Sequence, residues 1–208
     1  MVYTATNWVE GVTTLGPTNM NKIETELVYL DTRIPAAALS YGTTLPGSPV
    51  DGQEAILVDN TTNPAYQWRF RYNASSSSAY KWEFIGGDPM NVYVIAQEST
   101  TSTAWVDLPT DGPTFAAPRA GEYGIVFSVC AWHSVAGSTS SAGVAVGATA
   151  PVAPVVYVTA TGGITASTAT VLGSVVAGGL MKIRYQAANP GTAFFQARYM
   201  SVLPRRVS

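Results

Sequence analysis

An apolar stripe with helical spacing begins at residue 20 of this 208-residue chain. Met20, Ile23, Leu27, Leu30 and Ile34 follow one another in steps of three, four, three and four residues. Because an α-helix has 3.6 residues per turn, this spacing places all five side chains on one face. The pattern therefore predicts an amphipathic helix.

The sequence also marks the two ends of this helix. Thr18 or Asn19 can cap its first turn through a side-chain oxygen. Pro35 follows Ile34 directly and disfavours continuation of the helix. We therefore expect the helix over residues 18–35.

The same stripe has the register of a short coiled coil. Met20, Leu27 and Ile34 occupy a positions, and Ile23 and Leu30 occupy d positions. Leu at a with Ile at d disfavours dimers relative to trimers or tetramers. An amphipathic helix that lies on its own domain would show the same pattern over so short a stretch. We interpret the stripe as a trimer seam, and its e and g positions carry polar side chains: Glu24, Asp31, Glu26 and Arg33.

A second pattern, with a period of two, occupies the middle of the chain. Aromatic residues alternate with polar ones on both sides of a Ser-rich loop at residues 73–79. Alternation of this kind predicts a β-hairpin with one aromatic face and one charged face. The aromatic positions are Tyr66, Trp68, Phe70, Tyr72, Tyr80, Trp82 and Phe84.

From residue 90 onward the chain alternates short apolar runs with Gly, Pro and Ser turns, and no helical period interrupts them. Eight or nine strands at this spacing predict an antiparallel β-sandwich, and we expect a jelly roll. The strands are expected at about 92–97, 104–108, 113–117, 122–133, 142–147, 154–161, 168–176, 180–187 and 192–203.

The predicted fold class is therefore mainly β, assembled as a homotrimer. Four segments are expected along the chain: an N-terminal attachment arm at 1–17, a short trimeric coiled-coil helix at 18–35, a small aromatic-rich β module at 36–89, and a jelly-roll head domain at 90–208.

Composition excludes several partners. Only 12% of the residues are charged and the net charge is −2, so no basic surface is expected to neutralise the phosphates of nucleic acid. The longest apolar stretch, residues 142–164, is interrupted by Gly and Pro, so membrane insertion is not expected. The single cysteine, Cys130, excludes an intrachain disulfide and a cysteine-based zinc cluster.

Little in the sequence indicates catalysis. The only histidine, His133, differs in strand parity from Cys130, so the two side chains should point to opposite faces of a strand and not form a Cys/His pair. We expect His133 to be an exposed or strand-end residue. No phosphate-binding glycine loop, metal-ligand cluster or dinucleotide motif is recognisable. Catalytic residues, metals and cofactors are therefore not expected.

The aromatic hairpin is the best candidate for a binding surface. Flat rings beside Arg and Gln can stack on sugar rings, which makes Trp68, Tyr72, Tyr80 and Trp82 candidate glycan-binding residues. The alternative is that these rings form the core of their small module. Loops at 109–112 and 134–141 of the predicted jelly roll are a second candidate surface.

Three stretches of the chain resemble modules of tailed-phage structural proteins. Residues 6–13 and 19–24 resemble a short N-terminal segment of phage tail and base-plate proteins. Residues 45–54, continued at 68–72 and 81–87, are similar to a small β-module found in such proteins. Residues 115–123 and 198–208 resemble the trimeric jelly-roll ends of phage fibres and the C1q/TNF-like shape. The resemblance implies location in a virion and trimeric assembly.

We therefore expect a non-enzymatic virion protein, a trimeric tail fibre or spike that attaches to a host surface, with a host-surface glycan as receptor. Its N-terminal arm would bind other virion proteins. The alternatives are a capsid decoration or head-fibre protein with a mechanical role and, more remotely, a cell-wall hydrolase.

Overall fold

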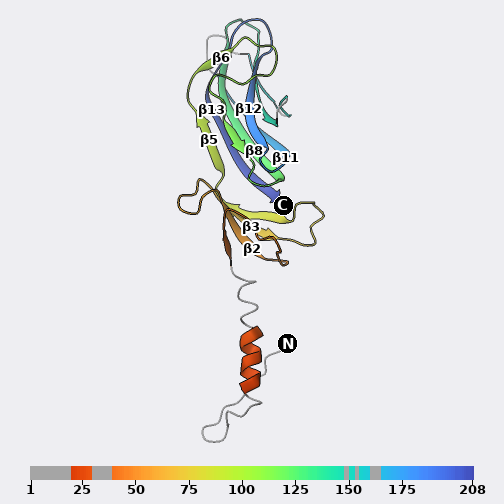
Figure 1. Cartoon of the computed structure of the whole chain (residues 1–208). Coiled ribbons are helices and arrows are strands. Elements are labelled where there is room, and N and C mark those ends of the chain that lie inside the picture. Colours follow the sequence, from red (N-terminus) through yellow and green to blue (C-terminus); the bar gives the residue numbers. More distant parts are fainter. Residues whose placement is uncertain (1–19, 30–38, 148–149, 153–154, 160–164) are drawn as a thin grey trace. The chain divides into compact units, whose positions relative to one another are not determined.

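The computed structural model describes residues 20–29, 39–147, 150–152, 155–159 and 165–208. The chain divides into two compact units, Met1–Ala38 and Leu39–Ser208. Within the first unit the described residues form one helix, 20–29, and the second unit contains strands β1 to β13 (Figure 1). The predicted arm at 1–17 and the last two residues of the stripe, Leu30 and Ile34, lie outside the described residues.

Most side chains of the helix are exposed. Met20, Ile23 and Leu27, the first three residues of the stripe, are 42%, 39% and 58% exposed. The described part confirms a short helix at the predicted place. The three described residues of the apolar stripe are thus exposed.

The aromatic hairpin forms as the alternation predicts. β2 (Glu54–Val58), β3 (Gln67–Tyr72) and β4 (Trp82–Gly87) pair antiparallel, and β1 (Ser40–Gly42) pairs parallel with β2. In β3 the side chains of Trp68 and Phe70 are buried, whereas Arg69 and Arg71 are exposed. A period of two therefore separates an apolar face from a charged face.

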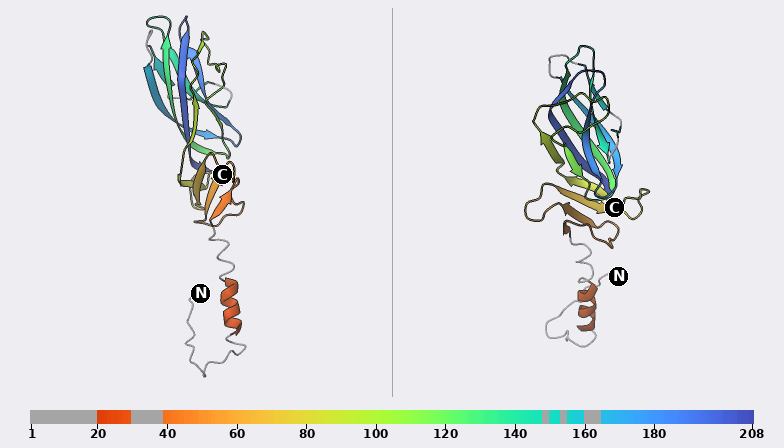
Figure 2. Two further views of the ribbon diagram at one scale, coloured as in Figure 1. Left: turned by 90° about the vertical axis from the view of Figure 1, so that its left-hand side faces the viewer. Right: turned by 45° about the horizontal axis from the view of Figure 1, so that its top comes forward.

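The remaining strands form a β-sandwich. One sheet contains β13, β8 and β11, with β5 and β6 both paired to β13, and the other has the order β10-β9-β12-β7. The views in Figure 2 show the long green and blue strands β8 and β13 running along the sandwich. Their bounds are β5 Met90–Val94, β6 Glu98–Thr100, β7 Thr114–Ala116, β8 Gly121–His133, β9 Ser140–Val146, β10 Val155–Val158, β11 Thr165–Val175, β12 Leu180–Ala187 and β13 Ala193–Val207.

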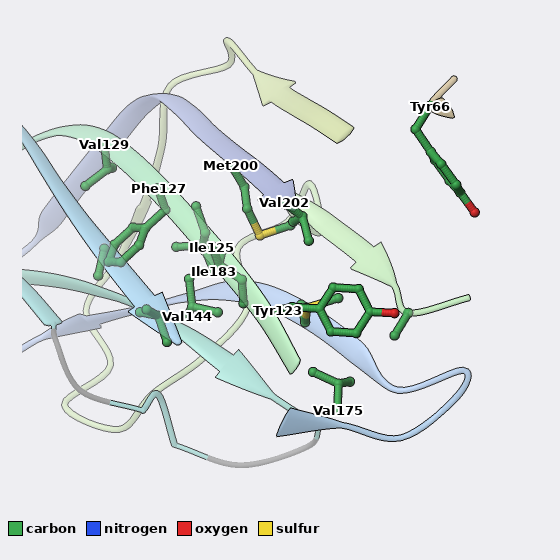
Figure 3. Close-up of a cluster of buried hydrophobic side chains, with 14 of the residues drawn as sticks. Tyr66, Tyr123, Ile125, Phe127, Val129, Val144, Val175, Ile183, Met200 and Val202 are labelled. Atoms are coloured by element: carbon green, nitrogen blue, oxygen red, sulfur yellow. The ribbon is translucent and has the colours of Figure 1, made fainter. Parts of the chain in front are cut away.

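Alternating side chains from the two sheets meet in the core. Ile125 and Phe127 of β8 lie opposite Val144 of β9 and Ile183 of β12, and all four side chains are fully buried (Figure 3). Burial of such side chains is the main favourable contribution to folding, about 1.5–3 kcal/mol for each large one. Trp68 and Phe70 of the hairpin belong to the same buried cluster.

β13 changes face twice. Ala193 and Phe195 point into the core, but after an irregularity between Gln196 and Tyr199 the inward positions become Arg198, Met200 and Val202. Ala197 has a left-handed φ of 47° at this point. An extra residue in one strand reverses the side-chain parity beyond it, which is the usual effect of a β-bulge.

A second irregularity lies between Pro204 and Arg206, and it turns Val207 inward. Proline cannot donate a ladder hydrogen bond, so it is tolerated in a strand where the pairing is already interrupted. The sequence predicts a strand at 192–203 that ends before Pro204, and this prediction is too short because the irregularity accommodates the proline. The pairing continues past Pro204 to Val207.

The end of β13 joins the hairpin to the sandwich. Arg206 and Val207 pair with Glu83 and Trp82 of β4 on one side, and with the start of β8 on the other. The approach to β8 is close, because a Cβ atom at Gly121 would lie 2.3 Å from the carbonyl oxygen of Arg206. The predicted boundary near residue 89 therefore falls inside one continuous sheet.

The strand predicted at 104–108 was wrong. These residues make one isolated bridge, Val106 with Tyr185. The Oγ of Ser102 donates to the carbonyl of Ala104 (2.9 Å) and accepts from its amide (3.1 Å). Such local side-chain bonds favour a turn over a strand ladder.

Replacement of Trp68 by Ala tests whether hairpin and sandwich share one core. We expect Trp68→Ala to lower the free energy of unfolding by about 3–5 kcal/mol, since the ring is fully buried. Ile85→Ala is the matched control, because Ile85 lies in the same hairpin and is 47% exposed. Calorimetry should show one shifted transition for Trp68→Ala. A hairpin that melts separately, or equal melting temperatures for the two variants, would contradict a shared core.

Candidate functional site

A groove lies where the hairpin, the 46–49 turn and the segment before β8 meet. We call it the Tyr72 groove, and its volume is about 240 Å³. Two of its wall residues, Trp82 and Ser208, place it at the start of β4 and at the C-terminal residue. Its walls are Pro46, Gly47, Pro49, Tyr72, Ala79, Lys81, Trp82, Arg119 and Ser208.

Two aromatic rings form part of the groove wall. Tyr72 and Trp82 are directly paired across β3 and β4, and their ring centroids are 5.3 Å apart in an edge-to-face arrangement. The Trp82 side chain is only 3% exposed, whereas Tyr72 is half-buried. Tyr72 therefore supplies the accessible ring surface, and Trp82 supports it from beneath.

Two cations line the same groove. The ammonium of Lys81 donates a hydrogen bond to the carbonyl oxygen of Ser76. The Nε of Arg119 is buried and has no hydrogen-bond partner among the described residues. Within the described part of the chain, neither Lys81 nor Arg119 forms an ion pair. The groove thus combines apolar surface with positive charge that no carboxylate side chain neutralises.

The structure places the four candidate glycan-binding side chains, Trp68, Tyr72, Tyr80 and Trp82, in different environments. Trp68 is fully buried, stacks on Tyr66 with 4.0 Å between ring centroids, and donates from Nε1 to the carbonyl of Asp88 (2.9 Å). Trp68 and Trp82 are therefore core residues, and Tyr80 is half-buried. The structure brings Tyr72 and Trp82 together at the groove.

Sequence reasoning did not assign Lys81 and Arg119 to this surface. Lys81 alternates with the rings of Tyr80 and Trp82, and this position predicts a side chain on the charged face of the hairpin. It is half-buried at the groove instead. Arg119 is distant in sequence and reaches the groove through the pairing of β8 with β13, which the local pattern does not reveal.

A buried ion pair is the second polar cluster of this unit. Arg198 is fully buried, and its Nη2 lies 2.8 Å from Oε2 of Glu98. Nη1 donates to the carbonyls of Thr110 and Gly112 at 3.3 and 3.4 Å. The guanidinium carbon also lies 5.5 Å from the ring centroid of Tyr185. Arg198 thus ties β13, β6 and the 110–112 loop together.

Burial alone would raise the pKa of Glu98. The hydrogen bonds from Thr110 and the charge and hydrogen bond of Arg198 outweigh burial and hold that pKa below its usual value. Burial raises the pKa of Tyr185, which keeps its hydroxyl protonated as it donates to Gly112 (3.0 Å). The polar groups of this cluster thus bind one another inside the sandwich.

His133 and Cys130 lie on opposite faces of β8, as their parity predicts. The sequence predicts that His133 is exposed or at a strand end, and the structure supports the second alternative: it is the last residue of β8, and its side chain is fully buried. Its Nδ1 accepts from the amide of Val135 (3.1 Å), and a Cβ at Gly191 would lie 2.6 Å from its ring. The ring is closed over by the Gly191 turn. Among the described residues, no group of three or more His, Cys, Asp or Glu side chains could hold a metal ion.

The two loops proposed as a binding surface are partly structural. Ser140 and Ser141 are buried and belong to β9, so only the first part of the 134–141 segment is an exposed loop. The 109–112 loop supplies the carbonyls that bind Arg198. No helix in the described part of the chain is long and apolar enough to span a membrane.

The described residues of the second unit thus define a mainly β protein built on a β-sandwich, with a cationic aromatic groove at one end. No protein-family model matches the chain, and no curated protein matches it.

Some solved structures are similar at a distance. The CBM22-1-GH10 modules of Clostridium thermocellum endo-1,4-β-D-xylanase 10B, complexed with xylohexaose, match 77% of the chain at 14% identity and a TM-score of 0.30. The chain spans only 26% of that protein. A CBM4 structure matches 71% of this chain and 78% of its own at 12% identity and a TM-score of 0.28.

The infectious bursal disease virus structure, Gx strain, matches 79% of this chain and 58% of its own at 11% identity, with a TM-score of 0.26. Similarities at this level assign neither a family nor a function to the chain.

The ion pair of Glu98 predicts a stability that depends on pH. Because its pKa is lowered by folding, Glu98 stabilises the fold above the ordinary value of 4.5, and this contribution is lost as the pH falls through the folded pKa. Glu98→Ala leaves Arg198 buried and unpaired, so we expect a loss of about 3–5 kcal/mol at neutral pH. Denaturant titration from pH 7 to pH 3 should show a weaker acid dependence in Glu98→Ala.

Glu54→Ala is the control for that experiment. The pair of Glu54 with Arg69 is more exposed, with 34% and 52% of the side chains accessible. It should contribute no more than about 1 kcal/mol. Equal losses for the two variants would contradict a special role for the buried pair.

Proposed function

We propose that this chain is a non-enzymatic structural component of a bacteriophage particle, a homotrimeric fibre or spike that mediates attachment to a host surface. The observation that carries the proposal is the exposed apolar stripe of the 20–29 helix. Met20, Ile23 and Leu27 are exposed in the single chain, and their heptad spacing fits burial against copies of the same helix. A helix this short is marginal by itself, so other contacts between chains must help.

The outer face of the larger sheet offers such a contact. On this face the outward side chains of β8, β11 and β13 are uncharged in the described part of the chain, apart from the end of the face where Glu122 and Arg205 lie. Leu172 is 63% exposed and Val126 is 38% exposed. Sheet faces that are open to water usually carry polar side chains, so the exposed apolar side chains of Leu172 and Val126 favour a partner surface here. We assign it to the neighbouring copies of the chain.

The strand order supports a jelly-roll head. A jelly roll has eight strands in two sheets. The orders β6-β13-β8-β11 and β7-β12-β9-β10 agree with this arrangement. The N-terminal arm at 1–17, with its Trp and Gly residues, would bind other virion proteins.

Charges on the stripe should weaken the trimer. We expect the wild-type protein to have three times the chain mass of 21.9 kDa in solution. The double variant Leu27→Glu, Leu30→Glu should dissociate at least partly, since the carboxylates would be buried unpaired in the seam. Thr25→Glu is the control, because it adds one negative charge, half that of the double variant, on the helix but off the stripe. Sedimentation equilibrium measures all three masses.

Two outcomes would contradict the proposal. A monomeric wild-type protein would end the idea of a trimeric fibre. A double variant that stays as trimeric as Thr25→Glu would show that the stripe is not a seam.

A further inference from the structure

We propose that the Tyr72 groove binds one anionic sugar residue of a cell-surface polysaccharide, with Lys81 and Arg119 holding its acidic group and Tyr72 contacting its ring. The proposal deepens host attachment and therefore rests on the function proposed above. It assigns a ligand class and a site to a chain whose net charge is −2.

The cations around the hairpin differ in whether a carboxylate neutralises them. Two neighbouring cations are neutralised, because Arg69 pairs with Glu54, and Nε of Arg206 lies 3.6 Å from Glu83. In the described chain Lys81 and Arg119 have no carboxylate partner, although both line one groove. Guanidinium and ammonium groups gain most from a charged acceptor, and such bonds are about twice as strong as neutral ones.

Arg119 has a buried nitrogen, Nε, without a hydrogen-bond partner among the described residues. A buried donor left without a partner is unfavourable. Arg119 as a whole is half-buried and lines the groove, so an anionic ligand that enters the groove contacts this side chain.

Part of the groove wall is apolar. Tyr72, Pro46, Pro49 and Ala79 present carbon surface on the walls next to the cations. Sugar rings bind aromatic side chains through their apolar C–H faces and bind polar groups through their substituents. A simple inorganic anion would use the cations and leave this surface unused.

The size of the groove limits the ligand. Its volume of about 240 Å³ is below the roughly 300–1,000 Å³ of sites for drug-sized ligands. A single sugar ring with one acidic substituent suits this volume, while the rest of a polysaccharide would extend into solvent. Affinity per chain should therefore be low, and three grooves in a trimer would raise it by multivalency.

Titration of the full-length protein tests the site. The probes are oligogalacturonate, a sulfated and a phosphorylated oligosaccharide, a neutral oligosaccharide of equal length, and inorganic phosphate. We expect at least one anionic saccharide to bind, with binding weakened by added salt. The neutral saccharide and phosphate should bind at least about 10-fold more weakly.

Variants locate the binding. Arg119→Gln and Lys81→Gln should each lower the affinity about 10-fold, the loss of one hydrogen bond to a charged group. Arg71→Gln is the matched control: Arg71 is an exposed cation of the same hairpin, but it alternates with Tyr72 and lies on the other face. It should bind like the wild type. Thermal melts check that all variants are folded, and Lys81→Arg restores the charge if the loss is electrostatic.

Three results would overturn the proposal. These are the absence of binding to every anionic saccharide, an affinity for inorganic phosphate equal to that for the saccharide, and equal losses of saccharide affinity in Arg119→Gln and Arg71→Gln. The mass of the same preparation separates this inference from the proposed function. A trimer that binds no anionic saccharide refutes the groove alone, whereas a monomer refutes the fibre whatever it binds.

Discussion

The final strand, β13, is the element on which the rest of the described β structure depends. It pairs with β8 along one side and with β6, β5 and β4 in succession along the other. A strand with partners on both sides has no free edge, and its backbone groups are satisfied by long-range pairing. Any change in its register would move buried side chains to the surface.

Two bulges make this long strand compatible with the core. The first turns Arg198 inward, and the second turns Val207 inward beside Trp82. A buried arginine requires a partner, and Glu98 with the carbonyls of the 110–112 loop supplies it. The segment that ends in Arg119 is positioned by the pairing of β7 with β12 and by the hydrogen bonds of Ala117 with the 178–179 turn. The hairpin face and this segment together create the Tyr72 groove.

Much of this architecture could be predicted from local patterns. Alternation over Trp68 and Phe70 gave the correct buried face of the hairpin, and the parity of β8 correctly separated Cys130 from His133. The bulges could not be predicted, because a single inserted residue leaves no local signal in an apolar run. The burial of His133 depends on the distant Gly191 turn. Arg119 was missed as a groove residue for the same reason, since only long-range pairing brings it to Tyr72.

The proposed function rests on three surfaces of the chain, each of which favours a partner. An exposed apolar helix stripe and an uncharged sheet face favour association with further copies, and a cationic aromatic groove favours a ligand from outside. A fibre would use the first two surfaces within the assembly and the third toward the host. The function proposed above requires in addition that the chain occurs on the outside of a phage particle.

Antibody labelling of purified phage particles that carry this gene tests that requirement most directly. With antibodies against residues 39–208, electron microscopy should show label at fixed positions on intact particles, and quantitative mass spectrometry should give copy numbers in multiples of three. Absence of the chain from purified particles, while it is abundant in the lysate, would contradict the account.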